Sequence, residues 1–245
     1  MSQDPKNIQE LLTSLDKEGV SAVIESLSQA QNPASVLQLI GDTVKALYWK
    51  RKDLPHVVAL GNGALSAGLA LVNGDREIGA RYEFLSAVKA IAYNIGSYTW
   101  PGWAERGITP TTTDLTIGLD AALLNLRLAQ ELDKGLLPLA RAHWLVGAQY
   151  ISANDLPAAR RHFQEAAVFA GRAENAGEQH LGQAFAGLVG AALADGGDKG
   201  RAESRQALRL ALDALAGIPD GEGFIEQVRT AAEVFGWTEM LPASK

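Results

Sequence analysis

The side chains that could do chemistry are few in this sequence, and they do not fall into catalytic spacings. The chain has four histidines, His56, His143, His162 and His180, and no cysteine. No H-E-x-x-H motif occurs, and no Glu-x-x-His pair recurs as it does in helical di-iron sites. The glycine-rich stretches GNGALSAG and ADGGDKG lack the spacing of phosphate-binding loops, and no G-x-S-x-G motif is present. We therefore expect no metal, no cofactor and no enzyme activity.

Segment 93–113, YNIGSYTWPGWAERGITPTTT, is distinctive because it concentrates aromatic side chains. The stretch 99–112, about fourteen residues, lacks a helical pattern, and loops of that length in compact proteins are usually functional or disordered. Trp100 and Trp103 would each bury a large apolar area, which argues against disorder. Two interpretations stay open. The loop either closes over a pocket shaped by Tyr93, Trp100 and Trp103, or fills a gap between helices as a plug.

The charge balance disfavours several kinds of partner. The net charge is -6, so we expect no broad attraction to nucleic acid or to anionic lipid. Hydrophobic residues make up 47% and charged residues 20% of the chain, which is typical of a globular protein. The start, MSQDPKNIQELL, has no signal-segment pattern, and no uninterrupted apolar run reaches the ~18 residues of a membrane span. We expect a cytoplasmic protein that does not bind membranes.

Helices must position these residues, because Ala, Leu, Gln, Glu and Arg dominate with apolar residues at spacings of three and four. Asn32, Asp53 and Asp155 are predicted to cap helices whose first turn contains a proline, and Thr111 with Asp114 is typical of a capping box. Short connections predict antiparallel neighbours. The predicted helices span roughly 5–18, 20–31, 34–51, 54–73, 76–97, 112–133, 136–152, 155–174, 178–195, 199–216 and 222–236.

The stretch HWLVGAQYISANDLPAARRHFQEAA, 143–167, resembles a tetratricopeptide repeat. Gly147, Tyr150, Ala159, Phe163 and Ala166 fall at the signature spacings of that family. Small residues at 147 and 159 would let two helices cross closely. Weaker matches cover 34–73, 76–133 and 182–219. The resemblance implies an all-α, right-handed α-α superhelix of about four helical hairpins, and the alternative is an irregular helical bundle.

The resemblance also implies a domain plan and a binding surface. The whole chain, 1–245, would form one domain, with N-terminal helices at 1–32, hairpins at 33–217 interrupted by the loop 99–112, and a C-terminal capping helix within 218–245. In the family, the first helices of successive hairpins line a concave groove that binds a peptide or a protein. The positions that correspond here are Asp42, Trp49, Phe84, Ala87, Ile91, Asn94, Arg141, Trp144, Ala148, Ile151, Gly187 and Ala191.

From these positions we predict a largely apolar groove with Trp49, Asn94, Arg141 and Trp144 as partner-binding residues, joined by Tyr93, Trp100 and Trp103 from the loop region. Trp49 and Trp144 could instead be core residues. The first hypothesis is therefore an interaction or scaffold protein that binds a peptide or partner protein. The alternative is a small-molecule binding module or enzyme with a pocket under the loop 99–112. A third hypothesis is self-association into a homo-oligomer through terminal hairpins.

Overall fold

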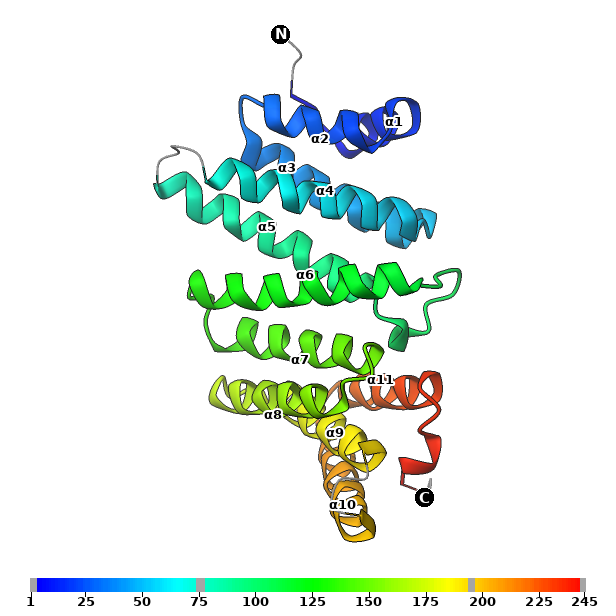
Figure 1. Ribbon diagram of the computed structural model, residues 1–245. Coiled ribbons are helices and arrows are strands. Elements are labelled where there is room, and N and C mark those ends of the chain that lie inside the picture. The colour runs from blue at the N-terminus through cyan, green and yellow to red at the C-terminus, as the bar shows by residue number, and fades with distance from the viewer. Residues whose placement is uncertain (1–3, 74–77, 194–196, 243–245) are drawn as a thin grey trace. The chain divides into compact units, whose positions relative to one another are not determined.

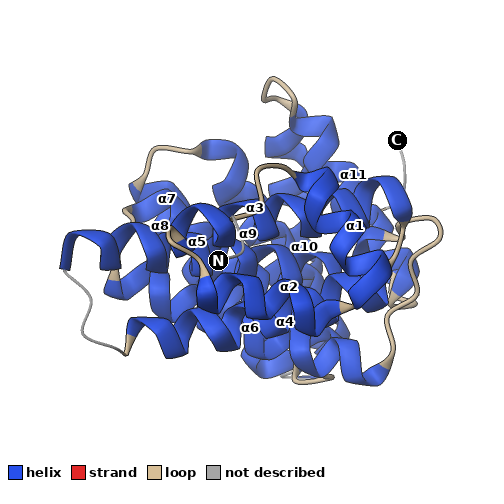
Figure 2. Ribbon diagram, turned by 90° about the horizontal axis from the view of Figure 1, so that it is seen from above, coloured by secondary structure: helices blue, strands red, loops and turns tan. Residues whose placement is uncertain are grey.

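The protein is built from helices in the part of the chain that the structure describes. The computed structural model describes residues 4–73, 78–193 and 197–242. Within these ranges no strand occurs (Figure 2), and helix makes up 83% of the chain. The predicted all-α class is therefore confirmed. Residues 1–3, 74–77, 194–196 and 243–245, which fall in the predicted segments 1–32, 33–217 and 218–245, lie outside the described residues.

Residue contacts divide the chain into two compact units. Unit 1 comprises Met1–Thr99 and Gly107–Leu132, and unit 2 comprises Trp100–Arg106 and Asp133–Lys245. Each unit has roughly 120 residues, which is enough to form a hydrophobic core of its own. The tryptophan-containing part of the predicted loop belongs to unit 2, although the helices on both sides of it belong to unit 1.

The helices of unit 1 follow the predicted boundaries within a few residues (Figure 1). In chain order they are α1 (Ile8–Glu18), α2 (Val20–Gln29), α3 (Pro33–Ala46), a π-helical turn η1 (Leu47–Arg51), α4 (Leu54–Val72), α5 (Ile78–Tyr98) and α6 (Thr112–Glu131). The last turn of the predicted helix 34–51 is thus wound as a π-helix. The core lies where α4 and α5 pack against each other and against α2, α3 and α6.

Predicted capping residues begin the helices of unit 1. The Asn32 side chain accepts a hydrogen bond from the Ser35 backbone N–H at 3.2 Å, and Asp53 accepts one from the His56 N–H at 3.3 Å. Thr111 and Asp114 form the predicted capping box, with each side chain bonded to the backbone N–H of the other residue. These side chains satisfy N–H groups that have no partner within the helix, which explains why the boundaries could be predicted locally.

Helix α4 has the length and the apolar composition of a membrane-spanning helix. Among the described residues it is the one helix that is long and apolar enough to cross a bilayer, judged by length and composition alone. A buried core helix has the same properties, and Val57, Leu60 and Ala64 are fully buried within unit 1. At Gly61, an added Cβ would lie 2.7 Å from the side chain of Ile95, so α4 and α5 meet closely there. These contacts account for the apolar character of α4.

Unit 2 contains the remaining helices, of which α7 to α11 each pack against the next helix in the chain. They are a short 3-10 turn η2 (Pro101–Trp103), α7 (Leu136–Ser152), α8 (Leu156–Arg172), α9 (Ala176–Leu193), α10 (Gly197–Ala216), α11 (Gly221–Val234) and a 3-10 turn η3 (Thr238–Met240). Asp155 caps α8 as predicted, because its side chain accepts a hydrogen bond from the Ala158 N–H at 3.0 Å. Helix α11 packs against η2, so the tryptophan segment lies inside this unit.

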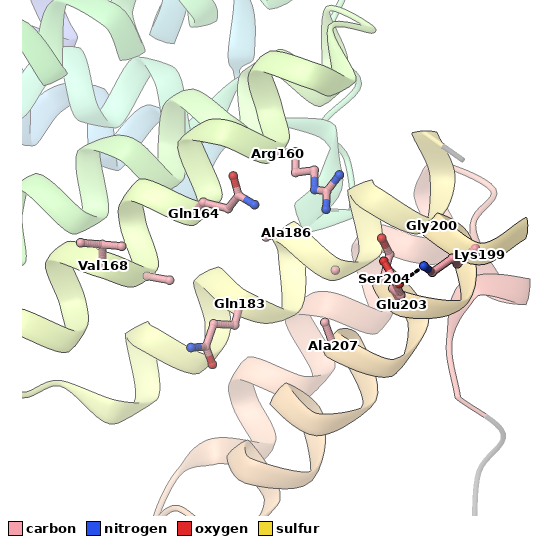
Figure 3. A pocket seen from close by; sticks show the side chains of 12 residues that line it. Arg160, Gln164, Val168, Gln183, Ala186, Lys199, Gly200, Glu203, Ser204 and Ala207 are labelled. Atoms are coloured by element: carbon pink, nitrogen blue, oxygen red, sulfur yellow. Dashed lines mark ion pairs between the residues drawn. The ribbon is translucent and has the colours of Figure 1, made fainter. Parts of the chain in front are cut away.

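Glycines set the spacing of α8, α9 and α10. A Cβ at Gly182 of α9 would lie 2.8 Å from the backbone N of Ala167 in α8. A Cβ at Gly187 would lie 2.7 Å from the backbone N of Leu208 in α10. Helix α9 is therefore flanked by α8 and α10 at close backbone approach. An open groove with a volume of 790 Å³ is bordered by all three helices (Figure 3).

Candidate functional site

Trp49 is the most exposed tryptophan described in the structure, and its local backbone is unusual. Its side chain is 56% exposed, whereas the adjacent Tyr48 is buried. Both lie in the π-helical turn η1, whose wider winding re-aims the side chains that follow α3. The chain then leaves the turn through Lys52, which has a left-handed conformation with φ of 54°. Since π-helical turns recur at functional sites, this turn is a candidate site.

Aromatic and cationic groups hold the exposed indole in place. Tyr48 stacks on Tyr98 with ring centroids 3.9 Å apart, and Trp49 meets both rings edge-on, at 4.9 and 6.1 Å. The Nζ of Lys52 lies 5.2 Å from the Trp49 ring centroid, within cation-π distance. Burial raises the pKa of Tyr98, while a hydrogen bond with Trp49 acts in the opposite direction. The indole N–H is the donor of that bond, so Trp49 is restrained at both its face and its polar edge.

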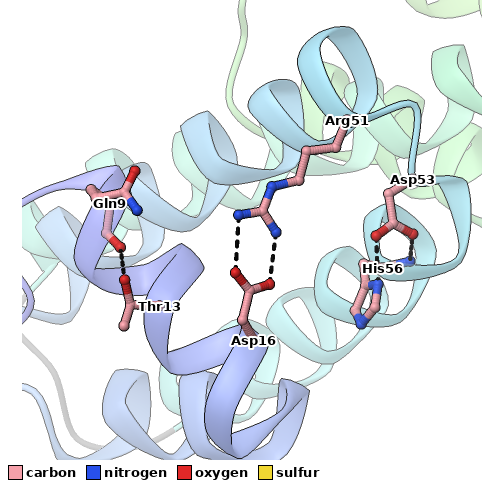
Figure 4. A network of polar contacts seen from close by, with 6 residues as sticks. All are labelled: Gln9, Thr13, Asp16, Arg51, Asp53 and His56. Carbon is pink, nitrogen blue, oxygen red and sulfur yellow. Dashed lines mark hydrogen bonds and ion pairs between the residues drawn. The ribbon is translucent and has the colours of Figure 1, made fainter.

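One ion pair anchors the same turn to α1, and a second, local pair follows it at the start of α4 (Figure 4). Arg51 forms a two-pronged pair with Asp16 of α1, with N–O distances of 2.7 and 3.0 Å. This bond lowers the pKa of Asp16 and raises that of Arg51. On the α4 side, Asp53 binds the His56 ring nitrogen at 2.7 Å. The bidentate geometry limits how far the turn can move relative to α1. The site is therefore preorganised, although both pairs are solvent-exposed and add little stability.

The surface around Trp49 carries more positive than negative charge. Lys50 is exposed beside the indole, and Lys45 is exposed one turn earlier, where it pairs with Asp42 at 3.0 Å. Arg51 and Lys52 lie close by; since Lys45 and Arg51 are each paired with a carboxylate, the excess positive charge near the indole comes from Lys50 and Lys52. We refer to Lys45, Trp49, Lys50, Arg51 and Lys52 as the Trp49 surface. An exposed aromatic side chain with a basic rim is suited to an apolar contact surrounded by carboxylates.

Most apolar positions of the predicted groove lie in the core, not on a surface. Phe84 and Ile91 of α5 are buried, as are Trp144, Ala148 and Ile151 of α7 and Gly187 and Ala191 of α9. Tyr93, Asn94 and Ala87 are half-buried. Arg141 is exposed, and its guanidinium binds Glu178 of α9 at 2.7 Å. The physical reason is that most of these helix faces are covered by neighbouring helices; Gly187, although little exposed, also borders the groove of α8, α9 and α10. Of the two tryptophans predicted to bind a partner there, only Trp49 is exposed.

The loop tryptophans enter the core of unit 2. Trp100 is 2% exposed and lies 5.3 Å from the Trp144 ring and 6.1 Å from the Phe185 ring, measured between centroids. Trp103 is half-buried, 5.0 Å from Trp100 and 5.7 Å from Trp144. Most of these pairs meet edge-to-face, the favourable arrangement of aromatic rings. The loop therefore acts as a plug, and the contacts of Trp100 correspond to core packing rather than to a lid over a pocket.

Two histidines of unit 2 form a pair that sequence analysis did not identify. The Nδ1 atoms of His143 in α7 and His162 in α8 lie 3.1 Å apart. His143 is 8% exposed and stacks on Phe169, while His162 lies against the Tyr150 ring. Burial lowers the pKa of both histidines to about 4. Within the described residues no group of three His, Cys, Asp or Glu side chains could hold a metal ion. The pair is a hydrogen bond between two neutral rings, one donating and one accepting.

This pair predicts a loss of stability in mild acid. Both folded-state pKa values, about 4, lie below the ordinary 6.5, so the unfolded chain binds more protons between these limits. Stability is therefore complete above about pH 7 and decreases as the pH falls toward 4. Allowing for partial solvent access, we expect the pair to contribute a loss of about 1–2 kcal/mol at pH 5. Urea unfolding at pH 7 and pH 5 measures it.

The control for this prediction is a variant without the titrating pair. His143→Phe, His162→Leu removes both imidazoles and retains apolar side chains at the two positions. It should lose less stability than the wild type between pH 7 and pH 5, by the same ~1–2 kcal/mol. An equal loss in both proteins would show that the histidine pair does not set the pH dependence. The spacing of 19 residues between the two histidines carries no sequence signal, because their contact depends on the α7–α8 crossing.

Comparisons with known proteins do not identify a family. No protein-family model matches the sequence, and no curated protein does. Among solved structures, a chain described as "Computational Design of Self-Assembling Cyclic Protein Homooligomers" aligns over 95% of this chain and 92% of its own length. That chain is 16% identical in sequence, and the TM-score is 0.26. At this TM-score the likeness carries no inference about fold or function.

Proposed function

We propose that this protein is an interaction module that binds a partner protein through the Trp49 surface. The observation that supports the proposal is a tryptophan that is 56% exposed yet restrained by a π-helical turn and by Tyr98. Exposing an indole in water is unfavourable, and ordering it beforehand reduces the entropy that binding must overcome. Tryptophan is also among the residues that contribute most to binding energy at interfaces. The proposed role is binding rather than catalysis.

The charges around Trp49 indicate the chemistry of the partner. Lys50 is exposed and Lys52 lies over the Trp49 ring, while Arg51 is paired with Asp16, so the basic rim consists mainly of the two lysines. A partner that places an apolar side chain on the indole and acidic side chains around it would match both features. The basic rim would also accelerate association, an effect that salt would weaken. We therefore propose an acidic protein surface with an apolar centre as the partner.

We also propose that the α7–α8 hairpin is a tetratricopeptide-like unit, and that the protein belongs among helical-repeat scaffolds. Two contacts support this. A Cβ at Gly147 would lie 3.0 Å from the ring of Phe163, which places the small residue against the large one as the repeat pattern requires. Asp155 begins the second helix of the hairpin through its side-chain cap. A scaffold of such hairpins presents rigid surfaces of the kind that the Trp49 proposal needs.

Trp49→Ala is expected to abolish partner capture while leaving the fold intact. The full chain, wild type or variant, is immobilised and exposed to a lysate of the source cells, and bound proteins are quantified by mass spectrometry. We expect at least one protein to be recovered with the wild type and to fall at least tenfold with the variant. Because Trp49 is exposed, the free energy of unfolding should change by less than about 1 kcal/mol.

The matched control is Tyr82→Ala, which removes another exposed aromatic side chain from the same unit. Tyr82 is 48% exposed on α5 and lies outside the Trp49 surface. Capture should be unchanged in this variant. If every protein recovered with the wild type is recovered equally with Trp49→Ala, the proposed surface is not the binding site.

A further inference from the structure

The groove in unit 2 contains two polar side chains that have no partner among the described residues. Ser204 of α10 lines the groove, is 5% exposed, and makes no hydrogen bond within the described chain. Arg160 of α8 lines the same groove, is half-buried, and its guanidinium forms no described ion pair or hydrogen bond. A buried polar group without a partner costs free energy, and the cost is larger for a charged group. Both side chains can donate hydrogen bonds, so they are suited to a ligand that accepts them.

The two polar groups converge on one place. A Cβ built at Gly190 of α9 would lie 2.7 Å from Ser204 Oγ and 3.2 Å from Arg160 Nε. Both atoms therefore lie beside the same stretch of α9 and near each other, so the two oxygens of one carboxylate in the groove could reach both. A guanidinium binds a carboxylate in a planar, two-pronged geometry, and a hydroxyl can complete the set. The arrangement is thus suited to an anionic oxygen ligand.

The charge balance of the groove favours an anion. Its carboxylate, Glu203, lies 3.9 Å from the ammonium group of Lys199 in an exposed pair on α10. These two charges offset each other, which leaves Arg160 as the uncompensated charge among the lining residues described (Figure 3). An acidic group bound there would be attracted to a half-buried cation more strongly than to one in open water, because the effective dielectric is lower.

The remaining lining residues fit an extended chain. The exposed amides of Gln164 on α8 and Gln183 on α9 border the groove. Gln164 can donate to and accept from a peptide backbone, whereas Gln183, whose Oε1 is bonded to His180 Nδ1 at 2.8 Å, offers its NH2 group as a donor. Between them the lining is small or apolar, from Ala167, Val168, Ala186, Gly187, Gly200 and Ala207. A volume of 790 Å³ suits a short extended segment, whereas a helix needs a channel about 10 Å wide along its length.

We propose that the groove of α8, α9 and α10 binds an extended peptide segment that contains an internal Asp or Glu, whose carboxylate pairs with Arg160 and Ser204. The segment's backbone lies along the amides of Gln164 and Gln183, and small side chains contact Ala186 and Ala207. This site is in unit 2, and it does not depend on the Trp49 surface, which is in unit 1. The protein would then bind partners at two separate places.

A peptide selection tests the proposal. The full chain is immobilised, and random heptapeptides are displayed as N-terminal fusions on phage, so that no free carboxyl terminus is offered. We expect the selected sequences to share one acidic position. Selected peptides are synthesised with acetylated and amidated ends, and their Kd values are measured by fluorescence polarisation. Replacing the shared Asp or Glu by Asn or Gln should weaken binding at least tenfold.

Variants of neighbouring residues provide the controls. Arg160→Gln should weaken binding at least tenfold, and it should abolish the difference between the acidic peptide and its amide version. Arg161→Gln removes the same charge from the next residue of α8, which does not line the groove, and should change Kd less than twofold. Ala186→Leu, which fills the groove without altering its charge, should block binding. Circular dichroism checks that each variant is folded. If Arg160→Gln does not fold, Arg160→Lys takes its place. Because Arg160→Lys keeps the charge, its Kd should lie between that of the wild type and a tenfold loss.

Two results would overturn the proposal. The first is a selection that yields no shared acidic position. The second is a set of peptides that binds Arg160→Gln and Ala186→Leu as tightly as the wild type. Peptides that lose affinity with Trp49→Ala but not with Arg160→Gln would locate binding on the Trp49 surface, and would therefore contradict the groove while supporting the other proposal.

Discussion

Replacing Trp100 by alanine is expected to destabilise unit 2 by about 3–5 kcal/mol, the range typical of a large aromatic side chain removed from a packed core. Trp100 is 2% exposed and contacts Trp103, Trp144, Phe185 and Phe235 through its ring. The cavity left behind would be bordered by large, rigid rings that cannot easily close it. Urea unfolding followed by circular dichroism measures the loss. A melting temperature lowered by more than about 10 °C is the corresponding thermal result.

The indole N–H makes this prediction sharper. Trp100 Nε1 is buried and has no hydrogen-bond partner in the described structure. Trp100→Phe therefore removes an unsatisfied donor along with some apolar area, and should cost much less than Trp100→Ala. Trp49→Ala is the matched control, because it deletes the same side chain from an exposed position. If the two alanine variants proved equally stable, the segment around Trp100 would not be a core plug.

Gly102 lies against the Trp100 ring and shapes the turn between the two tryptophans. A Cβ at this position would lie 2.2 Å from the Trp100 ring, so the ring lies directly against the glycine. Pro101 and Gly102 lie in the 3-10 turn between the tryptophans, and the two indole rings lie 5.0 Å apart. Which of the two interpretations of the loop applied could not be predicted, because lid and plug require the same aromatic residues. The distinction depends on tertiary burial.

Local sequence signals account for most of the helix boundaries. Capping by Asn32, Asp53 and Asp155 involves atoms only three residues apart, so the pattern suffices to predict it. The boundary of α7, Leu136–Ser152, agrees with the predicted 136–152. The π-helical turn at Leu47–Arg51 has no such signal, since its sequence is compatible with an ordinary α-helix. The candidate site was thus found only in part, through Trp49 itself.

The predicted partner-binding residues differ in how much of each side chain is exposed, and the sequence does not show this difference. Trp49 and Trp144 both lie on helices predicted to line one groove, yet the first is 56% exposed and the second 8%. Helical periodicity identifies an apolar face but cannot tell whether a neighbouring helix covers it. In unit 2 the rings of Trp100 and Phe185 cover Trp144. The contacts that decide this come from segments far apart in the chain, which a single sequence does not reveal.

The glycines of α9 are expected to give the second large effect. Gly187→Ala and Gly182→Ala should each cost about 3 kcal/mol, the upper part of the range for overpacking. In both cases the atoms that the new methyl group would meet, at 2.7 Å and 2.8 Å, belong to the backbone of the adjacent helix. A backbone cannot rotate away as a side chain can, so α10 or α8 would have to shift. The loss would exceed the ~1 kcal/mol that alanine gains over glycine in a helix interior.

A graded series of alanine substitutions distinguishes crowding from helix propensity. At Gly147 the three atoms nearest to the new methyl group all belong to the ring of Phe163, from 3.0 Å, so Gly147→Ala should cost less than either variant of α9, because a ring can tilt. Gly223 of α11 has nothing within 4 Å, and Gly223→Ala should stabilise the protein by about 0.5–1 kcal/mol. Urea unfolding of the four variants gives the order directly. If all four changed stability equally, the close approach of α8, α9 and α10 would not depend on these glycines, and the groove that the three helices border would lose its structural basis.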